Sequence, residues 1–152
     1  MASRTGRKSS ATRKREGHAT PVHTGGCLCG AVRFRATGKP TLVENCHCSM
    51  CRKASGAAMV TSANFPSDSF RWTKGKLKYY RSSATGRRGF CARCGSQLTF
   101  HRIGRRGEVS INVGSLDRPE RVKPWLHIYA ADAVPWMLTK DGLPRYARGI
   151  PK

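Results

Sequence analysis

Seven cysteines in three short clusters constrain this 152-residue chain more than any other feature of its sequence. Every cysteine belongs to one of these clusters: Cys27-x-Cys29, Cys46-x-Cys48-x-x-Cys51 and Cys91-x-x-Cys94. An odd number of cysteines leaves one thiol over when disulfides form. The N-terminus lacks the apolar run of a secretory signal peptide, so we expect a cytoplasmic protein. In that reducing compartment, clustered cysteines bind metal more often than they bind one another.

The spacing within the clusters suits thiolates that share an ion. Residues two apart in an extended segment point to the same side, so Cys27 and Cys29 can face one ion together. The segment from Cys91 to Cys94 can fold as a tight knuckle, because Gly95 supplies the positive φ that glycine adopts most easily. All-thiolate ligand sets favour zinc or an iron–sulfur cluster over magnesium or calcium. Of the two we expect zinc, which takes four ligands at structural sites and keeps one position open at catalytic sites. The sequence therefore predicts two Zn²⁺ ions, one structural and one catalytic.

The division of seven cysteines into four and three leaves two pairings open. One pairing joins the first and third clusters in a four-cysteine site and leaves Cys46, Cys48 and Cys51 as a three-cysteine site. The other joins the third cluster to Cys48 and Cys51 as a zinc ribbon. It leaves the remaining three cysteines without a shared ion. The first is more economical, because the second cluster is compact enough in sequence to bind one ion unaided.

Short strands dominate the rest of the chain. Val32 and Phe34 alternate with arginines between residues 31 and 36, the period of two that is typical of a half-buried strand. Similar runs, broken by Gly, Pro, Ser and Asp, occur at residues 41–45, 57–62, 77–81, 89–91, 97–102, 108–113 and 126–129. Helix signals are weak: Ser49 is a candidate cap for a turn over residues 50–54, and residues 65–70 suit another turn. We predict a mainly β fold with short helical turns.

The chain divides into a basic tail, residues 1–24, and one domain, residues 25–152, with a hinge at Gly25-Gly26. The tail holds six Lys or Arg and one Glu, with few apolar side chains, as disordered segments do. The whole chain has a formal charge of +21, most of which belongs to the domain. Such a charge suits a polyanion or would steer a small anionic substrate inward. We expect weak polyanion contact through the tail and, without about 20 consecutive apolar residues, no membrane partner.

Three motifs, in this order and spacing, resemble the glutathione-dependent formaldehyde-activating enzyme family, which includes the centromere protein V-like domain. They are GCLCGAVRF at residues 26–34, CHCSMCRK at residues 46–53 and FCARCG at residues 90–95. Four later segments add to the resemblance: GSLD at 114–117, PWLH at 124–127, AVPW at 133–136 and DGLP at 141–144. The resemblance covers roughly residues 24–147 and leaves out the basic tail.

This resemblance implies an Mss4-like β-sandwich with two zinc ions. It implies a structural site from Cys27, Cys29, Cys91 and Cys94, and a catalytic site from Cys46, Cys48 and Cys51. The implied reaction joins glutathione to formaldehyde as S-(hydroxymethyl)glutathione, which is a carbon–sulfur lyase reaction run in reverse. The expected partner is thus glutathione or another thiol adduct.

Three side chains next to the second cluster have expected roles. Arg52 and Lys53 follow Cys51 directly and are candidates for offsetting the negative charge of three thiolates. His47 stands between two cysteines, and adjacent residues on an extended chain point to opposite faces. We therefore expect His47 to lie beside the ligands or at the surface rather than on the ion.

Three more distant side chains have ordinary expected roles. Arg88 belongs to an arginine pair that suits an exposed turn. His127 lies in a strand-like run and is expected to be hydrogen-bonded or partly exposed. Asp141 precedes a glycine and is expected to serve a turn.

Two other functions remain open from the sequence. The first is a zinc-stabilised module that binds nucleic acid or another polyanion without catalysis, which the charge of +21 favours. Against it, the chain shows neither a basic recognition helix nor an interleaved aromatic platform. The second is a protein in which both zinc ions are structural, since small domains can depend on metal for folding.

Overall fold

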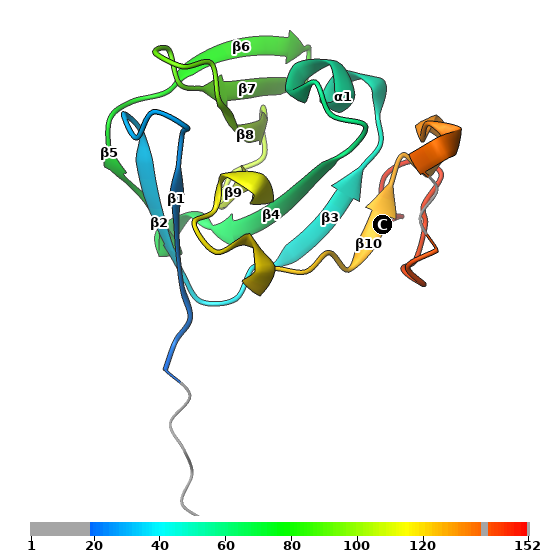
Figure 1. Ribbon diagram of the computed structural model, residues 1–152, viewed down its shortest axis with the longest axis horizontal. Coiled ribbons are helices and arrows are strands. Elements are labelled where there is room, and N and C mark those ends of the chain that lie inside the picture. Colours follow the sequence, from blue (N-terminus) through cyan, green and yellow to red (C-terminus); the bar gives the residue numbers. More distant parts are fainter. Residues whose placement is uncertain (1–18, 138–139, 152) are drawn as a thin grey trace, which may run out of the picture.

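Two β-sheets face each other in the computed structural model, which describes residues 19–137 and 140–151 (Figure 1). The smaller sheet has the order β1–β2–β5, from β1 (Val22–Gly26), β2 (Arg33–Thr37) and β5 (Phe70–Lys74). The larger sheet has the order β10–β3–β4–β9–β8–β7–β6. Its strands are β3 (Leu42–Cys46), β4 (Val60–Pro66), β6 (Lys78–Ser83), β7 (Gly86–Phe90), β8 (Gln97–Arg102), β9 (Glu108–Asn112) and β10 (Leu126–Ile128).

Helices are short, as the weak helical periodicity predicts. The one α-helix of the described residues, α1 (Ser49–Ser55), follows β3 and lies beside the β6–β7 hairpin (Figure 1). Five 3-10 turns complete the described chain: η1 (Ser67–Ser69), η2 (Val113–Ser115), η3 (Pro119–Arg121), η4 (Ala130–Asp132) and η5 (Pro135–Met137). The mainly β prediction is confirmed. Of the helices that the structure describes, none has the length and apolar character that crossing a membrane requires.

The main core lies between the two sheets and follows from the alternation in the strands. In β2, Phe34 and Ala36 are buried while Arg35 between them faces outward. They pack with residues of the larger sheet that include Val43, Phe65 and Ile111. Because this core covers one face of the larger sheet, the opposite face is left to form a site.

Several predicted boundaries differ from the structure. The run predicted at residues 57–62 forms a strand three residues later, at β4, while β1 and β5 were not predicted at all. The predicted tail is wrong in its last residues, because β1 begins at Val22 and pairs with β2. His23 is buried there, with its ring 5.3 Å from that of Phe65. The tail prediction for residues 1–18 lies outside the described residues.

Gly25 ends up inside a strand rather than in the predicted hinge. A Cβ atom at this position would lie 2.4 Å from Cζ of Phe34 and 2.4 Å from the carbonyl oxygen of Ser115. Neither atom can yield easily, because one belongs to a buried ring and the other to the backbone. The glycine therefore permits a close approach between β1, β2 and η2.

Gly25→Ala is expected to lower the free energy of unfolding by about 2 kcal/mol, the usual cost of overpacking a core. Urea denaturation monitored by circular dichroism measures the change. Gly114→Ala is the matched control, because a Cβ there would meet no atom within 4 Å. Equal stability of the two variants would show that β1 does not pack as described.

Candidate metal centres and the adjoining cavity

The structure brings the first and third cysteine clusters together, as in the first of the two pairings. The Sγ atoms of Cys27, Cys29, Cys91 and Cys94 all lie within 4.8 Å of one another. One pair follows β1 and the other follows β7, so two segments 62 residues apart meet here. The ribbon pairing does not form.

The geometry of this four-cysteine cluster fits a tetrahedral ion. A tetrahedral site with Zn–S distances of about 2.3 Å has sulfur atoms about 3.8 Å apart. Cys29 Sγ lies 3.6 Å from Cys27 Sγ and 3.9 Å from Cys91 Sγ. Gly95 has a φ of +77° and its N–H donates to the carbonyl of Cys91, which closes the predicted knuckle. The donor set therefore suits a structural zinc ion.

Hydrogen bonds favour the thiolate form of Cys27 and Cys94, whereas the neighbouring thiols raise the pKa of Cys29 to about 11. Ser96, through its hydroxyl and its backbone, lowers the pKa of Cys94 to about 5. The N–H of Val32 donates to Cys27 Sγ at 3.2 Å. Donors aimed at sulfur stabilise the charged state that a metal ligand needs.

The second cluster gathers Cys46, Cys48 and Cys51 at the junction of β3 and α1. Their Sγ atoms lie within 4.8 Å of one another, and Cys46 Sγ is 3.4 Å from Cys51 Sγ. Cys48, rather than the expected Ser49, caps α1, since its sulfur accepts from the N–H of Cys51 at 3.3 Å. The helix cap thus fixes two of the three sulfurs relative to each other.

Three sulfurs this close cannot all ionise without a cation. Hydrogen bonds from Cys46 and Cys51 lower the pKa of Cys48, whereas bonds to Cys48 and Cys51 raise the pKa of Cys46 well above its usual range. Without an ion, Cys48 therefore loses its proton most easily and Cys46 keeps its proton. A divalent ion at the centre offsets the repulsion between the negative sulfurs, so that all three can be thiolates. The donor set fits a zinc ion with one position left for another ligand.

Arg88 is the cation that faces the three-cysteine cluster. Its Nη2 donates toward Cys51 Sγ at 3.6 Å, and its charge helps to lower the pKa of Cys48. The side chain is buried, with its guanidinium 5.1 Å from the ring centre of Phe100. The prediction of an exposed turn is wrong, because β7 spans residues 86–90 and alternation turns Arg88 to the site. A longer strand assignment would have revealed this.

Arg88→Met is expected to weaken zinc binding at the three-cysteine cluster by about tenfold or more, as loss of a supporting contact usually does. Competition with a chelating indicator measures the affinity. Arg87→Met is the matched control, because Arg87 lies over the ring of Tyr79 at 4.5 Å, away from the cluster. Unchanged affinity in Arg88→Met would remove this role.

Arg52 and Lys53, which were expected to offset the negative charge of the thiolates, make other contacts. Arg52 Nη1 donates to the carbonyl of His47 at 2.9 Å and to the carbonyl of Asp132. It therefore ties the cysteine loop to η4. Lys53 is exposed and lines, with Arg88 and Phe90, a cavity of about 430 Å³ beside α1.

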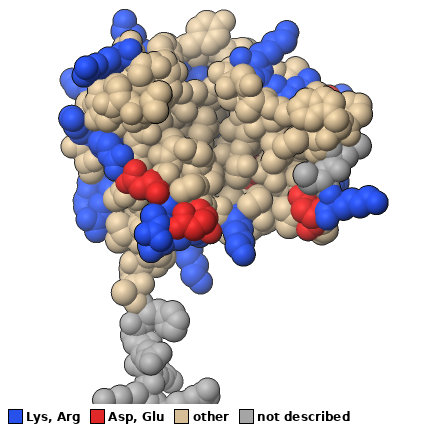
Figure 2. Space-filling model, viewed as in Figure 1, with Lys and Arg blue, Asp and Glu red and all other residues tan. Residues whose placement is uncertain are grey.

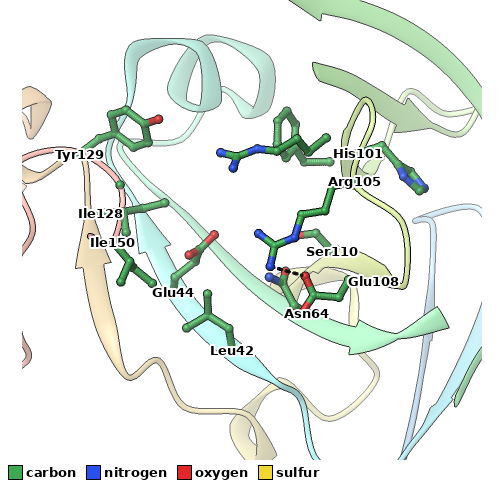
Figure 3. A pocket seen from close by; sticks show the side chains of 13 residues that line it. Leu42, Glu44, Asn64, His101, Arg105, Glu108, Ser110, Ile128, Tyr129 and Ile150 are labelled. Carbon is green, nitrogen blue, oxygen red and sulfur yellow. Dashed lines mark ion pairs between the residues drawn. The ribbon is translucent and has the colours of Figure 1, made fainter. Parts of the chain in front are cut away.

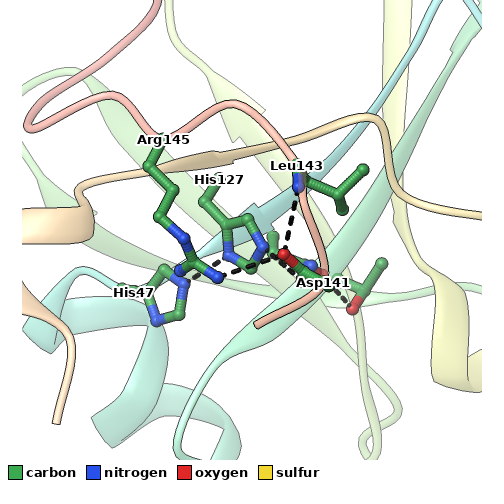
Figure 4. A network of polar contacts seen from close by, with 7 residues as sticks. His47, His127, Asp141, Leu143 and Arg145 are labelled. Carbon is green, nitrogen blue, oxygen red and sulfur yellow. Dashed lines mark hydrogen bonds and ion pairs between the residues drawn. The ribbon is translucent and has the colours of Figure 1, made fainter. Parts of the chain in front are cut away.

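A chain of polar side chains, buried at its two histidines, supports the cysteine loop (Figure 4). His47 Nε2 lies 2.7 Å from His127 Nδ1, and His127 Nε2 lies 2.8 Å from Oδ2 of Asp141. Arg145 pairs with the same carboxylate at 3.1 Å. A carboxylate only accepts, so His127 donates to Asp141 and receives from His47. His47 is thus a buried support beside the ligands, and Asp141 does more than serve a turn.

A cavity of about 240 Å³ lies on the open face of the larger sheet (Figure 3). Tyr129 lines it and also packs against the cluster of Cys46, Cys48 and Ile128. Tyr129 has φ +52°, the one positive φ of a non-glycine residue in the described chain. The N–H of Tyr129 donates to the carbonyl of Arg148, and the N–H of the next residue, Ala130, donates to the carbonyl of Tyr146. Such strain is commonest at functional sites.

Comparisons with known proteins show what this chain is similar to. A sequence model of the glutathione-dependent formaldehyde-activating enzyme family matches residues 22–132, which hold all seven cysteines. A curated relative from Halomonas elongata, provisionally named a glutathione-dependent formaldehyde-activating enzyme, is 34% identical over 83 residues. The match covers 49% of this chain and 52% of the relative, so the chain spans about half the length of that protein. A crystal structure of a Rhodobacter sphaeroides protein has a TM-score of 0.49 and 24% identity, over 81% of this chain and 98% of that one.

Proposed function

The chain belongs to the glutathione-dependent formaldehyde-activating enzyme family, and from this premise we propose that it joins glutathione to formaldehyde at the three-cysteine cluster. One observation carries the proposal. Three sulfurs meet beside an open cavity, whereas the other cluster has the four that complete a tetrahedral ion. The three-cysteine cluster therefore has a place for a further sulfur ligand, and the four-cysteine cluster does not.

The reaction forms one bond between the glutathione sulfur and the formaldehyde carbon. The thiol proton ends on the former aldehyde oxygen, and the product is S-(hydroxymethyl)glutathione. This is the reverse of a carbon–sulfur lyase reaction. A zinc ion held by Cys46, Cys48 and Cys51 would supply ionisation of the incoming thiol at neutral pH.

The chain's own residues contribute charge and position. Arg88 offsets the negative charge of three thiolates from a buried position, where a cation acts strongly. The His47–His127 pair and Arg52 hold the cysteine loop in one geometry, so that reactants meet in a fixed orientation. The basic surface would draw in glutathione, which is a net anion. We include a cytoplasmic setting in the proposal, because clustered thiols stay reduced and available to a metal in that compartment.

The approach to equilibrium tests this proposal. Glutathione and formaldehyde are mixed rapidly, and the loss of free thiol is followed with zinc-loaded protein, with zinc-stripped protein and with buffer. We expect faster loss only with the zinc-loaded protein. Equal rates in all three samples would remove the proposed reaction.

A basic groove supports polyanion binding as a second candidate function. The groove has a volume of about 650 Å³. It is lined by the edge strand β6 of the larger sheet, by β7 and β8, and by the segment that leads into β9. Its lining is rich in arginine and also holds two aromatic rings: Arg81, Arg87, Arg102, Arg105, Arg106, Tyr79 and His101. On the face seen in Figure 2, Lys and Arg side chains are spread around the rim. The contact proposed for the basic tail lies outside the described residues.

Binding of a labelled single-stranded DNA oligonucleotide tests this second function. Arg81→Ala is expected to reduce the slope of log affinity against log salt by about 0.7, the value for one lost phosphate contact. Lys74→Ala, at an exposed position on the three-stranded sheet, is the control. Binding that disappears with residues 1–18, or that is unchanged by Arg81→Ala, would contradict a role for the groove.

A further inference from the structure

The cavity beside the three-cysteine cluster carries both signs of charge. Glu44, Glu108, Arg102 and Arg105 line it, together with the polar side chain of Asn64. Its volume of about 240 Å³ is below the ~300–1,000 Å³ that encloses a whole drug-sized ligand. It therefore suits one end of a substrate whose other end lies elsewhere.

Two acceptor groups in this cavity lack a partner within residues 19–137 and 140–151. The carboxylate of Glu44 is half-buried, yet no hydrogen bond or ion pair reaches it from those residues. Oδ1 of Asn64 is fully buried and is also without a donor there. Buried polar oxygens normally find a donor, so an incoming cation with several N–H groups would satisfy both.

Donor groups lie at the mouth of the same cavity. Arg102 and Arg105 are exposed and act electrostatically on Glu44. Arg105 pairs with Glu108 at 3.0 Å, whereas no hydrogen bond or ion pair in the described chain uses the guanidinium of Arg102. In Figure 3, Glu44 and Arg105 face each other across the opening, while His101 points away. A guanidinium fork is the usual partner of a carboxylate.

Strand register places this cavity next to the reacting cluster. Glu44 and Cys46 are two residues apart on β3, so their side chains point to the same face, about 7 Å apart along the strand. Across the sheet, Asn64 pairs with Ser110, Ser110 with Phe100, and Phe100 with Arg88. One face of the sheet thus holds the sulfurs, the cation at the sulfurs and the charged cavity.

We propose that this cavity binds the α-amino acid end of the thiol substrate. The α-ammonium donates to Glu44 and Asn64, and the α-carboxylate accepts from Arg102. The inference rests on the proposed function, because a thiol held at the three-cysteine cluster brings the γ-glutamyl end of glutathione within reach of Glu44. Because the cavity offers both a carboxylate and a guanidinium, we expect it to bind a thiol with an ammonium and a carboxylate more tightly than a thiol with a carboxylate alone.

Calorimetric titration of the zinc-loaded protein tests the inference. The probes are glutathione and an analogue in which hydrogen replaces the α-amino group. We expect Glu44→Gln to weaken glutathione binding about tenfold, the loss of one charged hydrogen bond, and to leave the analogue unaffected. Glu120→Gln is the matched control, since Glu120 is exposed and pairs with Arg118. Thermal denaturation checks that each variant is folded.

The outcomes separate this inference from the proposed function. Wild-type protein that binds neither probe would remove the function and the inference together. Glutathione that binds wild type and Glu44→Gln equally would overturn only the inference. Arg102→Gln gives a second readout: it is expected to weaken both probes about tenfold, since both keep the α-carboxylate. Unchanged affinity in Arg102→Gln would also contradict the assignment.

Discussion

Replacing Cys91 with serine is expected to unfold the protein at room temperature. Cys91 is buried and packs with Cys27, Val32 and Leu98 in a small core cluster, which meets the main core through Trp72. Structural zinc sites contribute about 10–16 kcal/mol in small domains, which is comparable to the whole stability of about 5–15 kcal/mol. Loss of one of four thiolates therefore removes most of the folding free energy.

Far-ultraviolet circular dichroism and zinc content of purified Cys91→Ser measure this effect. We expect loss of the β signal and of bound zinc. Ser96→Ala is the matched control: it removes the hydroxyl 3.3 Å from Cys94 Sγ but no ligand, and the protein should stay folded. A Cys91→Ser protein that melts within a few degrees of wild type would show that the four-cysteine cluster does not hold the fold together.

Cys48→Ser is expected to abolish turnover while the protein stays folded. Cys48 caps α1 through its sulfur, and a serine hydroxyl is a better helix cap than a thiol. The substitution therefore removes a thiolate from the three-cysteine cluster without freeing the helix. Changes around a metal cost 10–100-fold even beyond the ligands themselves, so we expect more than about a hundredfold loss of activity.

Zinc content and thermal denaturation of Cys48→Ser separate the two clusters. We expect zinc to fall from two ions per chain to one, with a melting temperature close to that of wild type. Ser49→Ala, the adjacent exposed position, is the control and should keep both ions. A Cys48→Ser protein with full turnover would refute catalysis at this cluster, whatever its zinc content.

The strands with clear alternation were predictable, and those without it were not. Val32 and Phe34 alternate with arginines, and β2 follows directly from them. β1 holds two glycines, so its place in the sheet depends on pairing with β2, which the local sequence does not encode. β5 has three of five residues exposed and lies at the edge of its sheet, where the hydrophobic pattern is weak.

The cysteines of the two candidate metal sites could be predicted from the sequence, but the side chains around them could not. Cysteine spacing alone limits the ways in which seven thiols can share two ions. Alternation within a strand sets the face of Arg88 and of Glu44, but only the pairing of the strands decides which residues each of them meets there. Asp141 meets His127 across a separation of 14 residues in the sequence, a contact that no local pattern indicates.

The exchange rate between free glutathione and S-(hydroxymethyl)glutathione at equilibrium tests most directly the claim that the three-cysteine cluster is the reacting site. Magnetisation-transfer NMR measures this rate in mixtures of glutathione and formaldehyde with zinc-loaded wild type, with Cys48→Ser and without protein. We predict faster exchange with wild type alone. Equal exchange in the three samples, or acceleration that Cys48→Ser retains, would contradict it.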